Sequence, residues 1–262
     1  MIEDREFYDK DVPLDVIPEW SSDVVRWAEN WVTEARRWFA GRTDVRMLDL
    51  GAGSCTTSLI LSREPFVSEV VAADLSTRRM QQMVPHIRAI YGGSPEKLSY
   101  VEADMNERLD FPDDHFDLVV MDAALHHSRN IWGTLAEIRR ILKPGGYFVA
   151  QREQYAPTLT AGYKFRKLLQ TEEVQAGVSE NAYLKSQYAY YLRANGFEPR
   201  FVPVLTTLPY KLLFFANGWL FSKYNILARS TKQPASGAKE RVSDAAHPQA
   251  EPLETLSTQS LA

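Results

Sequence analysis

Two hydrophobic patterns alternate along the middle of the chain. Short runs rich in Val, Tyr and Phe are typical of buried strands, and they lie at 45–50, 70–74, 98–102, 116–121 and 147–151. The stretches near 56–63, 77–91 and 131–142 have helical spacing. This alternation predicts a doubly wound α/β fold, a mostly parallel sheet with right-handed crossovers and helices on both faces.

The pattern continues with a helix at about 180–195, which Asn195-Gly196 ends. Two further strands at 199–204 and 225–230 bring the predicted sheet to seven strands. The α/β domain is therefore expected to span 45–230.

Residues 1–44 form a helical preamble to this domain. Ser21 or Ser22 is expected to cap its helix, and Gly41 to end it. The apolar stripe of this helix consists of Val24, Trp27, Trp31 and Trp38. The stripe either packs on the domain or forms a lid over a pocket, and the two interpretations are compatible.

Two later segments have unusual compositions. The aromatic insert 208–222 is predicted either to pack under the last strands or to offer an apolar wall to a hydrophobic or lipid-linked ligand or a membrane surface. Residues 231–262 contain no Phe, Trp or Tyr, which predicts a disordered tail.

Charge and cysteine content narrow the function classes. The 262 residues carry a net charge of -4, which argues against a nucleic-acid partner. Cys55 is the single cysteine, so no intramolecular disulfide can form. The acidic N-terminus does not resemble a signal peptide, and Lys211, Asn217 and Lys223 interrupt the longest apolar stretch. We expect a cytoplasmic protein.

The strongest motif is the segment 45–55, where a buried strand ending in Asp49 leads into Gly51, Gly53 and a helix. Glycines permit a tight turn and close approach of a ligand, and the helix N-terminus offers free N–H groups. A nicotinamide fingerprint needs a third glycine, and Thr56 stands there instead, which disfavours a dehydrogenase.

Acids follow the next two strands. Asp74 ends the second strand, where a carboxylate meets ribose hydroxyls in doubly wound nucleotide sites, and Asp104 follows the third. Leu142-Lys-Pro-Gly-Gly-Tyr-Phe-Val then forms a helix stop, a turn and the fifth strand. Over residues 45–152 this order of motifs resembles the class I S-adenosylmethionine-dependent methyltransferases, especially the group acting on small molecules.

The resemblance implies a role for each motif. Asp49 and the turn Gly51-Ala52-Gly53 would bind the methionine part of S-adenosylmethionine, and Asp74 would bind both ribose hydroxyls. The remaining residues implied to bind the cofactor are Leu75 beside the adenine, Asp104 at its amino group, Met105 on its ring, and Asp122. Cys55 stands where the family often has a smaller residue.

Asp122-Ala-Ala-Leu-His-His-Ser128 follows the fourth strand and should face the same site. His126 or His127 is the candidate catalytic base, because histidine titrates nearest neutrality. A pocket wall and a structural helix start are the alternatives for this pair. No metal is expected, because neighbouring side chains diverge and no cluster of further ligands is evident.

Weaker candidates for site residues are Tyr8, Arg152, Glu153 and the tyrosines of 183–191. The sequence thus predicts methyl transfer from S-adenosylmethionine to a small-molecule acceptor, a hydroxyl oxygen of a glycan, a lipid-linked intermediate or a natural product. Methylation of carbon or nitrogen is the alternative, as is a catalytically silent cofactor-binding partner protein. The acceptor and the oligomeric state stay open.

Overall fold

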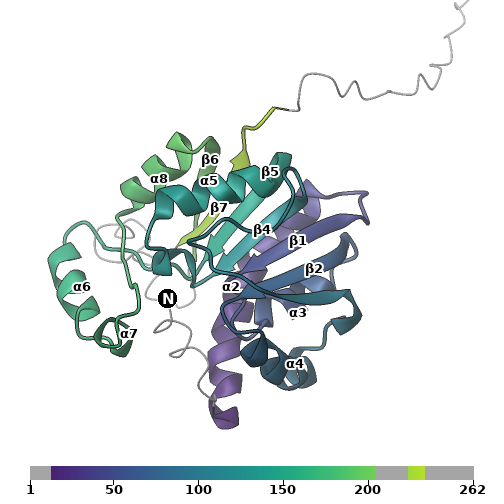
Figure 1. The fold of residues 1–262 in the computed structure, drawn as a ribbon, viewed down its shortest axis with the longest axis horizontal. Coiled ribbons are helices and arrows are strands. Elements are labelled where there is room, and N and C mark those ends of the chain that lie inside the picture. Colours follow the sequence, from purple (N-terminus) through teal and green to yellow (C-terminus); the bar gives the residue numbers. More distant parts are fainter. Residues whose placement is uncertain (1–12, 205–223, 234–262) are drawn as a thin grey trace, which may run out of the picture.

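The computed structural model describes residues 13–204 and 224–233. In this part of the chain, seven strands form one sheet in the order β3-β2-β1-β4-β5-β7-β6 (Figure 1). The strands are β1 Val45–Leu50, β2 Val67–Asp74, β3 Leu98–Glu102, β4 Phe116–Asp122, β5 Leu142–Gln151, β6 Phe197–Pro203 and β7 Tyr224–Ser230. Neighbours from β3 through β5 are parallel, and β7 is antiparallel to β5 and β6. The predicted doubly wound, mostly parallel fold is confirmed.

Helices cover both faces of the sheet. The α-helices are α2 Ile17–Trp38, α3 Thr56–Ser62, α4 Thr77–Tyr91, α5 Ile131–Ile141, α6 Ala161–Leu168, α7 Glu172–Gln175 and α8 Lys185–Ala194. Helices α5 and α8 contact each other on the near face in Figure 1, whereas α2 (purple) lies behind the sheet and contacts α3 and α4. Short 3-10 helices are η1 Leu14–Val16, η2 Pro95–Lys97 and η3 Leu125–His127.

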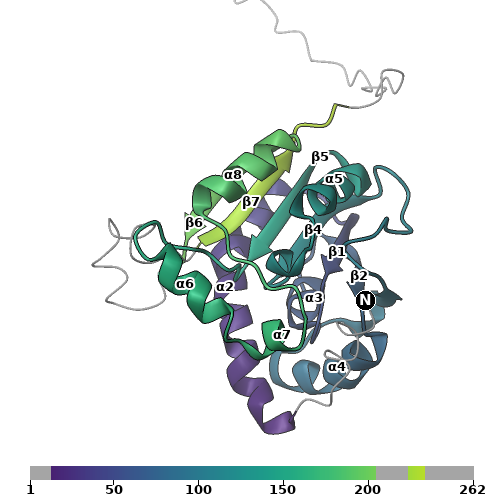
Figure 2. The ribbon, with the colours of Figure 1, turned by 60° about the vertical axis from the view of Figure 1, so that its left-hand side comes forward.

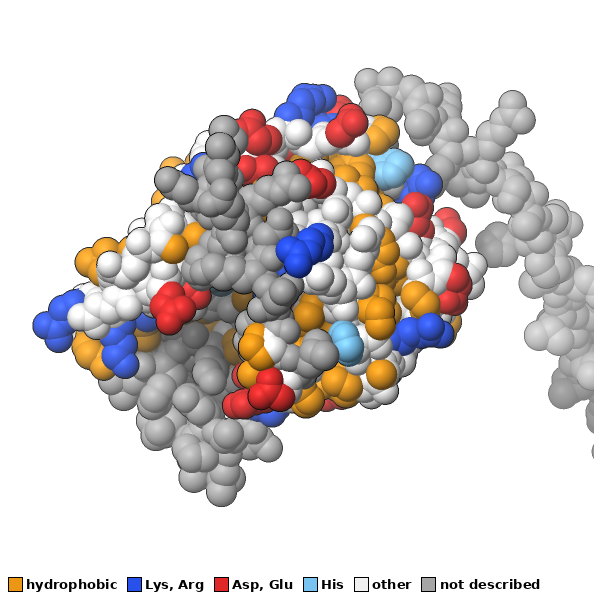
Figure 3. Space-filling view, turned by 60° about the horizontal axis from the view of Figure 1, so that its bottom comes forward, with side chains coloured by type: hydrophobic (Ala, Val, Ile, Leu, Met, Phe, Trp, Pro, Cys, Tyr) orange, Lys and Arg blue, Asp and Glu red, His pale blue; other side chains and the backbone are white. Residues whose placement is uncertain are grey.

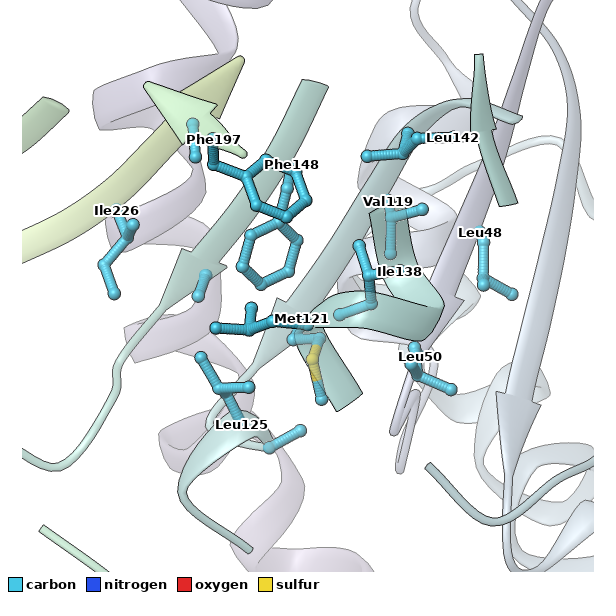
Figure 4. Close-up of a cluster of buried hydrophobic side chains, with 14 of the residues drawn as sticks. Leu48, Leu50, Val119, Met121, Leu125, Ile138, Leu142, Phe148, Phe197 and Ile226 are labelled. Atoms are coloured by element: carbon cyan, nitrogen blue, oxygen red, sulfur yellow. The ribbon is translucent and has the colours of Figure 1, made fainter. Parts of the chain in front are cut away.

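The core is apolar on each side of the sheet because the central parallel strands are buried on both faces. On the α5 side, Leu48, Val119 and Phe148 pack against Ile138 (Figure 4). On the α2 side, the same strands turn Met47, Leu118 and Val149 toward the helix. Alternate residues of one strand therefore hold opposite helical layers to the sheet.

Helix α2 packs on the sheet, one of the two arrangements that the sequence allowed for its apolar stripe. Trp31 is fully buried, and its Nε1 donates to Gln151 Oε1 at 2.7 Å. Trp38 stacks on Tyr147 of β5 with ring centroids 4.2 Å apart. The aromatic stripe read from the sequence thus lies against the sheet.

The start of α2 differs from the expectation. The helix begins at Ile17 with Pro18 in its first turn, so the predicted cap at Ser21 or Ser22 is wrong. Ser21 lies inside the helix and its hydroxyl donates back to the Ile17 carbonyl at 2.6 Å, a bond that small hydroxyls make within helices.

The helix expected at 180–195 is also shorter than predicted. α8 begins at Lys185, because Asn181 is engaged elsewhere: its Nδ2 donates to the carbonyls of His126 and Ser128 at 3.0 and 3.2 Å. The end at Asn195-Gly196 is confirmed, with Gly196 at φ +75°. Helices α6 and α7, in the segment between β5 and α8, were not predicted.

Strand β6 forms one edge of the sheet and pairs on its inner side with β7. It contains Pro199 and Pro203, which lack the N–H group. On the opposite edge lies β3.

Several predictions concern segments outside the described residues. The aromatic insert 208–222, Tyr8 and residues 234–262 of the tail lie there. Within the described helices, none combines the length and apolar character that crossing a bilayer requires.

Candidate functional site

A cavity of about 450 Å³ lies at the carboxyl ends of the parallel strands. This is the edge where ligands bind in doubly wound sheets, and the volume falls within the roughly 300–1,000 Å³ of small-molecule sites. Ten of the predicted site residues line it: Gly51, Ala52, Gly53, Asp74, Leu75, Asp104, Met105, Asp122, His126 and His127. The remaining one, Asp49, lies buried below the lining.

The glycine turn is shaped by neighbours at the ends of two strands, Ala124 after β4 and Asp74 at the end of β2. A Cβ at Gly51 would lie 2.6 Å from the Ala124 Cβ, so no larger residue fits without movement. Gly53 has open space around it, and its N–H donates to Asp74 Oδ2 at 2.8 Å. This bond fixes the turn after β1 to the end of β2.

Asp49 is a fully buried carboxyl group at the end of β1. Its Oδ2 accepts from the Ser58 hydroxyl at 2.6 Å, and its Oδ1 has no hydrogen-bond partner in the described part of the chain. Burial raises the pKa of Asp49 to about 7, and the negative charges of Asp122 and Asp74 add to the rise. A cation next to Asp49 would relieve this cost.

Asp104 already has protein partners. Its Oδ1 accepts from the Asn106 backbone and side chain at 2.8 Å each, and Oδ2 accepts from Arg129 at 3.0 Å. These contacts orient the carboxylate at the cavity rim; its predicted contact with an adenine stays a prediction.

Backbone strain concentrates where β4 and β5 end. Ala123 and Arg152 have φ of +51° and +54°, a left-handed conformation that costs non-glycine residues free energy. The guanidinium of Arg152 forms two hydrogen bonds with Asp122, at 2.6 and 2.9 Å. The two strand ends are therefore fixed to each other beside the cavity.

Glu153 organises the histidine end of the cavity. Its buried carboxylate accepts from the backbone N–H groups of Ala124, Leu125 and His126 at 3.0–3.3 Å. It also lies 2.8 Å from His126 Nδ1. Because the carboxylate is an acceptor, Nδ1 donates its proton to Glu153, and Nε2 lies 3.7 Å from Glu180 Oε1.

His127 has a different environment. Burial disfavours its charged form, but the hydrogen bond and charge of Glu180 outweigh burial and raise the pKa of His127. Its Nδ1 lies 2.9 Å from Glu180 Oε2 and 2.9 Å from the Ser179 carbonyl. His127 is therefore held toward its protonated form, which makes it a poor proton acceptor.

His126, His127 and Glu180 also offer one possible metal-ligand atom each within 4.8 Å of one another. The sequence gives no sign of this juxtaposition, because Glu180 is distant from the histidines in the chain. The expectation of no metal stays a prediction.

Other lining residues were also missed. Ile17, Ser21 and Val24 of α2 line the cavity, and so does the segment after β5 through Gln154, Glu173, Val178, Ser179 and Glu180. Val24 belongs to the apolar stripe, for which a lid over a pocket was one of the two interpretations; the other residues belong to no motif, so only their positions in the structure reveal them. Glu153, predicted as a weak candidate, positions His126 rather than lining the cavity.

Comparison with known proteins identifies methyltransferases as relatives of this chain. Residues 48–150 match a family model described as a methyltransferase domain. The uncharacterized methyltransferase YcgJ of Bacillus subtilis is 33% identical over 116 residues, 44% of this chain and 43% of that protein. The ubiquinone/menaquinone biosynthesis C-methyltransferase UbiE of Coxiella burnetii is 33% identical over 143 residues, 53% of each chain.

Solved structures are similar in fold. The YcgJ structure from Bacillus subtilis aligns with a TM-score of 0.57 at 18% identity, covering 78% of this chain and 100% of that one. An S-adenosylmethionine-dependent methyltransferase from Mesorhizobium loti aligns with a TM-score of 0.52 at 22% identity, covering 75% and 96%.

Residues 48–150 therefore form a methyltransferase domain, and the fold around them is that of the class I S-adenosylmethionine-dependent methyltransferases. The chain spans about half the length of the curated relatives it matches. The substrates in the names of those relatives are statements about those proteins alone.

The glycine turn provides a first test. Gly51→Ala should destabilise the protein more than Gly53→Ala, because both positions have positive φ but only Gly51 meets Ala124. We expect Gly53→Ala to lower the free energy of unfolding by about 1–2 kcal/mol, and Gly51→Ala to lower it by at least ~2 kcal/mol more, as measured by urea denaturation. Equal losses for the two variants would contradict the close approach.

Asp49 provides a test by pH. The raised pKa of Asp49 means that the native state binds the proton more tightly than the unfolded chain does. The stabilisation that this proton gives the native state is therefore full below about pH 4 and is lost as the pH rises through 7. Between pH 5 and 8 the wild type should lose roughly 2–3 kcal/mol that Asp49→Asn does not lose.

The control for Asp49 is Asp44→Asn, a surface acid before β1, which should keep the pH dependence of the wild type. The free energies of unfolding of Asp49→Asn and of the wild type are measured by urea denaturation across this pH range. If both change with pH in the same way, Asp49 is not a protonated buried acid.

Proposed function

We propose that this protein transfers a methyl group from S-adenosylmethionine to a small-molecule acceptor. The observation that carries the proposal is one cavity with strand-end acids and a glycine turn at one end and the His126–Glu153 pair at the other. Methyl transfer is an in-line displacement, and holding both partners in one cavity supplies most of its rate enhancement.

The cofactor end fits S-adenosylmethionine chemically. The unpartnered oxygen of buried Asp49 suits a nearby cationic group, and the glycine turn leaves room for close approach. Asp74 lies on the lining, and its oxygens keep acceptor capacity for ribose hydroxyls beyond the bonds from Gly53 and Ser76. When bound, the cofactor supplies an electrophilic methyl group on a sulfonium.

The acceptor end is polar. Around the histidines, the lining includes Arg152, Gln154, Ser179 and Glu180. Groups of this kind favour a polar acceptor with hydroxyls over a purely apolar one, because buried polar groups need hydrogen-bond partners.

His126 is the residue we assign as general base. Glu153 fixes the ring through Nδ1, which leaves the lone pair of Nε2 for an acceptor proton. The same carboxylate would stabilise the imidazolium that forms, as carboxylates do in other histidine-based catalytic sites.

The acceptor atom is a hydroxyl oxygen in this proposal, of a glycan, a lipid-linked intermediate or a natural product. The case for oxygen rests on His126 alone. Methylation of an acidic carbon is the second candidate, since it also needs a base and since UbiE of Coxiella burnetii is named a C-methyltransferase. The position of the methyl group in the product separates the two.

Cofactor binding tests the first half of the proposal. S-adenosylhomocysteine should raise the melting temperature and NADH should not. Asp74→Asn should weaken S-adenosylhomocysteine binding about tenfold or more in calorimetric titration, because a charged acceptor is lost.

The matched control for Asp74→Asn is Asp44→Asn, which removes an acid at the opposite end of the sheet and should bind normally. Stabilisation by NADH alone would instead indicate a dehydrogenase. Binding without turnover on any acceptor would indicate a silent cofactor-binding protein.

The second half is tested at His126. His126→Gln should lower kcat about 10²–10⁴-fold and remove the fall of kcat on the acid side of the pH profile, while S-adenosylhomocysteine affinity stays within about twofold. Glu153→Gln should lower kcat by a smaller factor than His126→Gln and shift the pH at which kcat falls. His127→Gln should keep the fall of kcat that the wild type shows on the acid side. A His126→Gln enzyme with wild-type kcat across pH rules out the base assignment.

A further inference from the structure

The segment after β5 forms a cap beside the acceptor end of the cavity. We define the cap segment as residues 155–183; its two ends meet in a bridge between Tyr155 and Tyr183. Its inner side contributes Val178, Ser179 and Glu180 to the cavity lining. In Figures 1 and 2, its helices α6 and α7 project from the body of the sheet on the side of the strand ends.

The cap segment carries a concentration of exposed apolar side chains. Of eight large hydrophobic side chains exposed in the described residues, four lie within eleven positions of this segment. These four, which we name the outer patch, are Leu159 (63% exposed), Tyr163 (55%), Phe165 (41%) and Leu169 (64%). Scattered single apolar residues are ordinary on protein surfaces, whereas such a concentration marks an interaction site.

The charged side chains within the outer patch are basic, and acidic ones follow it at Glu172 and Glu173 of α7. Between residues 159 and 170 the sequence contains Lys164, Arg166 and Lys167 and no acidic residue. Lys164 Nζ is turned inward and donates to Gln154, while Lys167 lies over the Tyr163 ring at 5.1 Å. Figure 3 shows Lys and Arg side chains (blue) beside hydrophobic ones (orange) at the left edge, the side on which Figure 1 shows α6.

We propose that the outer patch and its basic side chains dock the cap segment onto an anionic phospholipid surface. Aliphatic and aromatic side chains interleaved with Lys and Arg are the composition of interfacial segments that insert into headgroups and pair with anionic lipids. A short projecting helix can insert into a bilayer because the bilayer deforms around it. A protein partner would instead need a groove that matches the helix. Docking brings the acceptor end of the cavity next to the lipid surface, because the same segment forms its wall.

Vesicle binding of the 262-residue chain, without cofactor or acceptor, tests this proposal. The protein should co-sediment with vesicles of phosphatidylcholine and phosphatidylglycerol, less at high salt, and much less with phosphatidylcholine alone. Arg166→Gln with Lys167→Gln should weaken binding about 25-fold, roughly fivefold for each side chain. Leu159→Ser with Leu169→Ser should weaken it at least about tenfold.

The matched control is Arg88→Gln with Ile90→Ser, which removes a basic residue and an exposed apolar residue (45%) from α4 and should bind as the wild type does. Circular dichroism and melting temperature check that each variant is folded. Since the assay contains no cofactor, its failure leaves the methyl-transfer proposal unaffected.

Three results would overturn the docking proposal. The protein could fail to bind the anionic vesicles, or the two patch variants could bind like the wild type, which would put the contact on another segment. A concentration-dependent dimer that Leu159→Ser with Leu169→Ser abolishes would instead identify a second copy of this chain as the occupant.

Discussion

The contact between Gly51 and Ala124 brings the two halves of the cavity together. Strands β1 and β4 are neighbours in the sheet, and the turns that follow them approach until a Cβ at Gly51 would lie 2.6 Å from Ala124. The turn after β1 lines the end of the cavity that we propose for the cofactor, and Ala124 immediately precedes η3 with its histidines. The absence of a side chain at Gly51 therefore allows the glycine turn to lie directly against the residue that precedes η3.

Glu153 stabilises the other half by an uncommon concentration of hydrogen bonds. Three consecutive backbone N–H groups and one imidazole bind its carboxylate, and it follows directly after strained Arg152. The left-handed turn at Arg152 redirects the chain as β5 ends, and Glu153 then anchors η3. The cost in backbone strain is offset by charge-assisted hydrogen bonds, which are among the stronger ones in proteins.

The sequence predicted what depends on local chemistry. Strand–helix alternation gave the sheet, and glycines and acids after strands identified the lining near Gly51, Asp74 and Asp104. What it could not predict depends on contacts between distant residues. Glu180 contacts His127, which is 53 residues away in the sequence, and Trp31 of α2 bonds to Gln151, which is 120 residues away. No local sequence pattern indicates either contact.

The misplaced helix starts have the same origin. Ser21 satisfies the local rule for a cap, yet Pro18 begins the helix earlier and the hydroxyl bonds within it. The loop before α8 looks helical in sequence, but Asn181 bonds to η3 and keeps it extended. In both cases a hydrogen bond that the hydrophobic periodicity does not indicate determines where the helix begins.

The prolines of β6 have a consequence for how the sheet ends. An open edge normally presents donors and acceptors that recruit a strand from another molecule, a route to aggregation. At Pro199 and Pro203 the donors are missing, so an incoming strand would find an interrupted ladder. The two prolines thus disfavour edge-to-edge association at this side of the sheet, while β6 still pairs with β7 from Phe197 to Pro203.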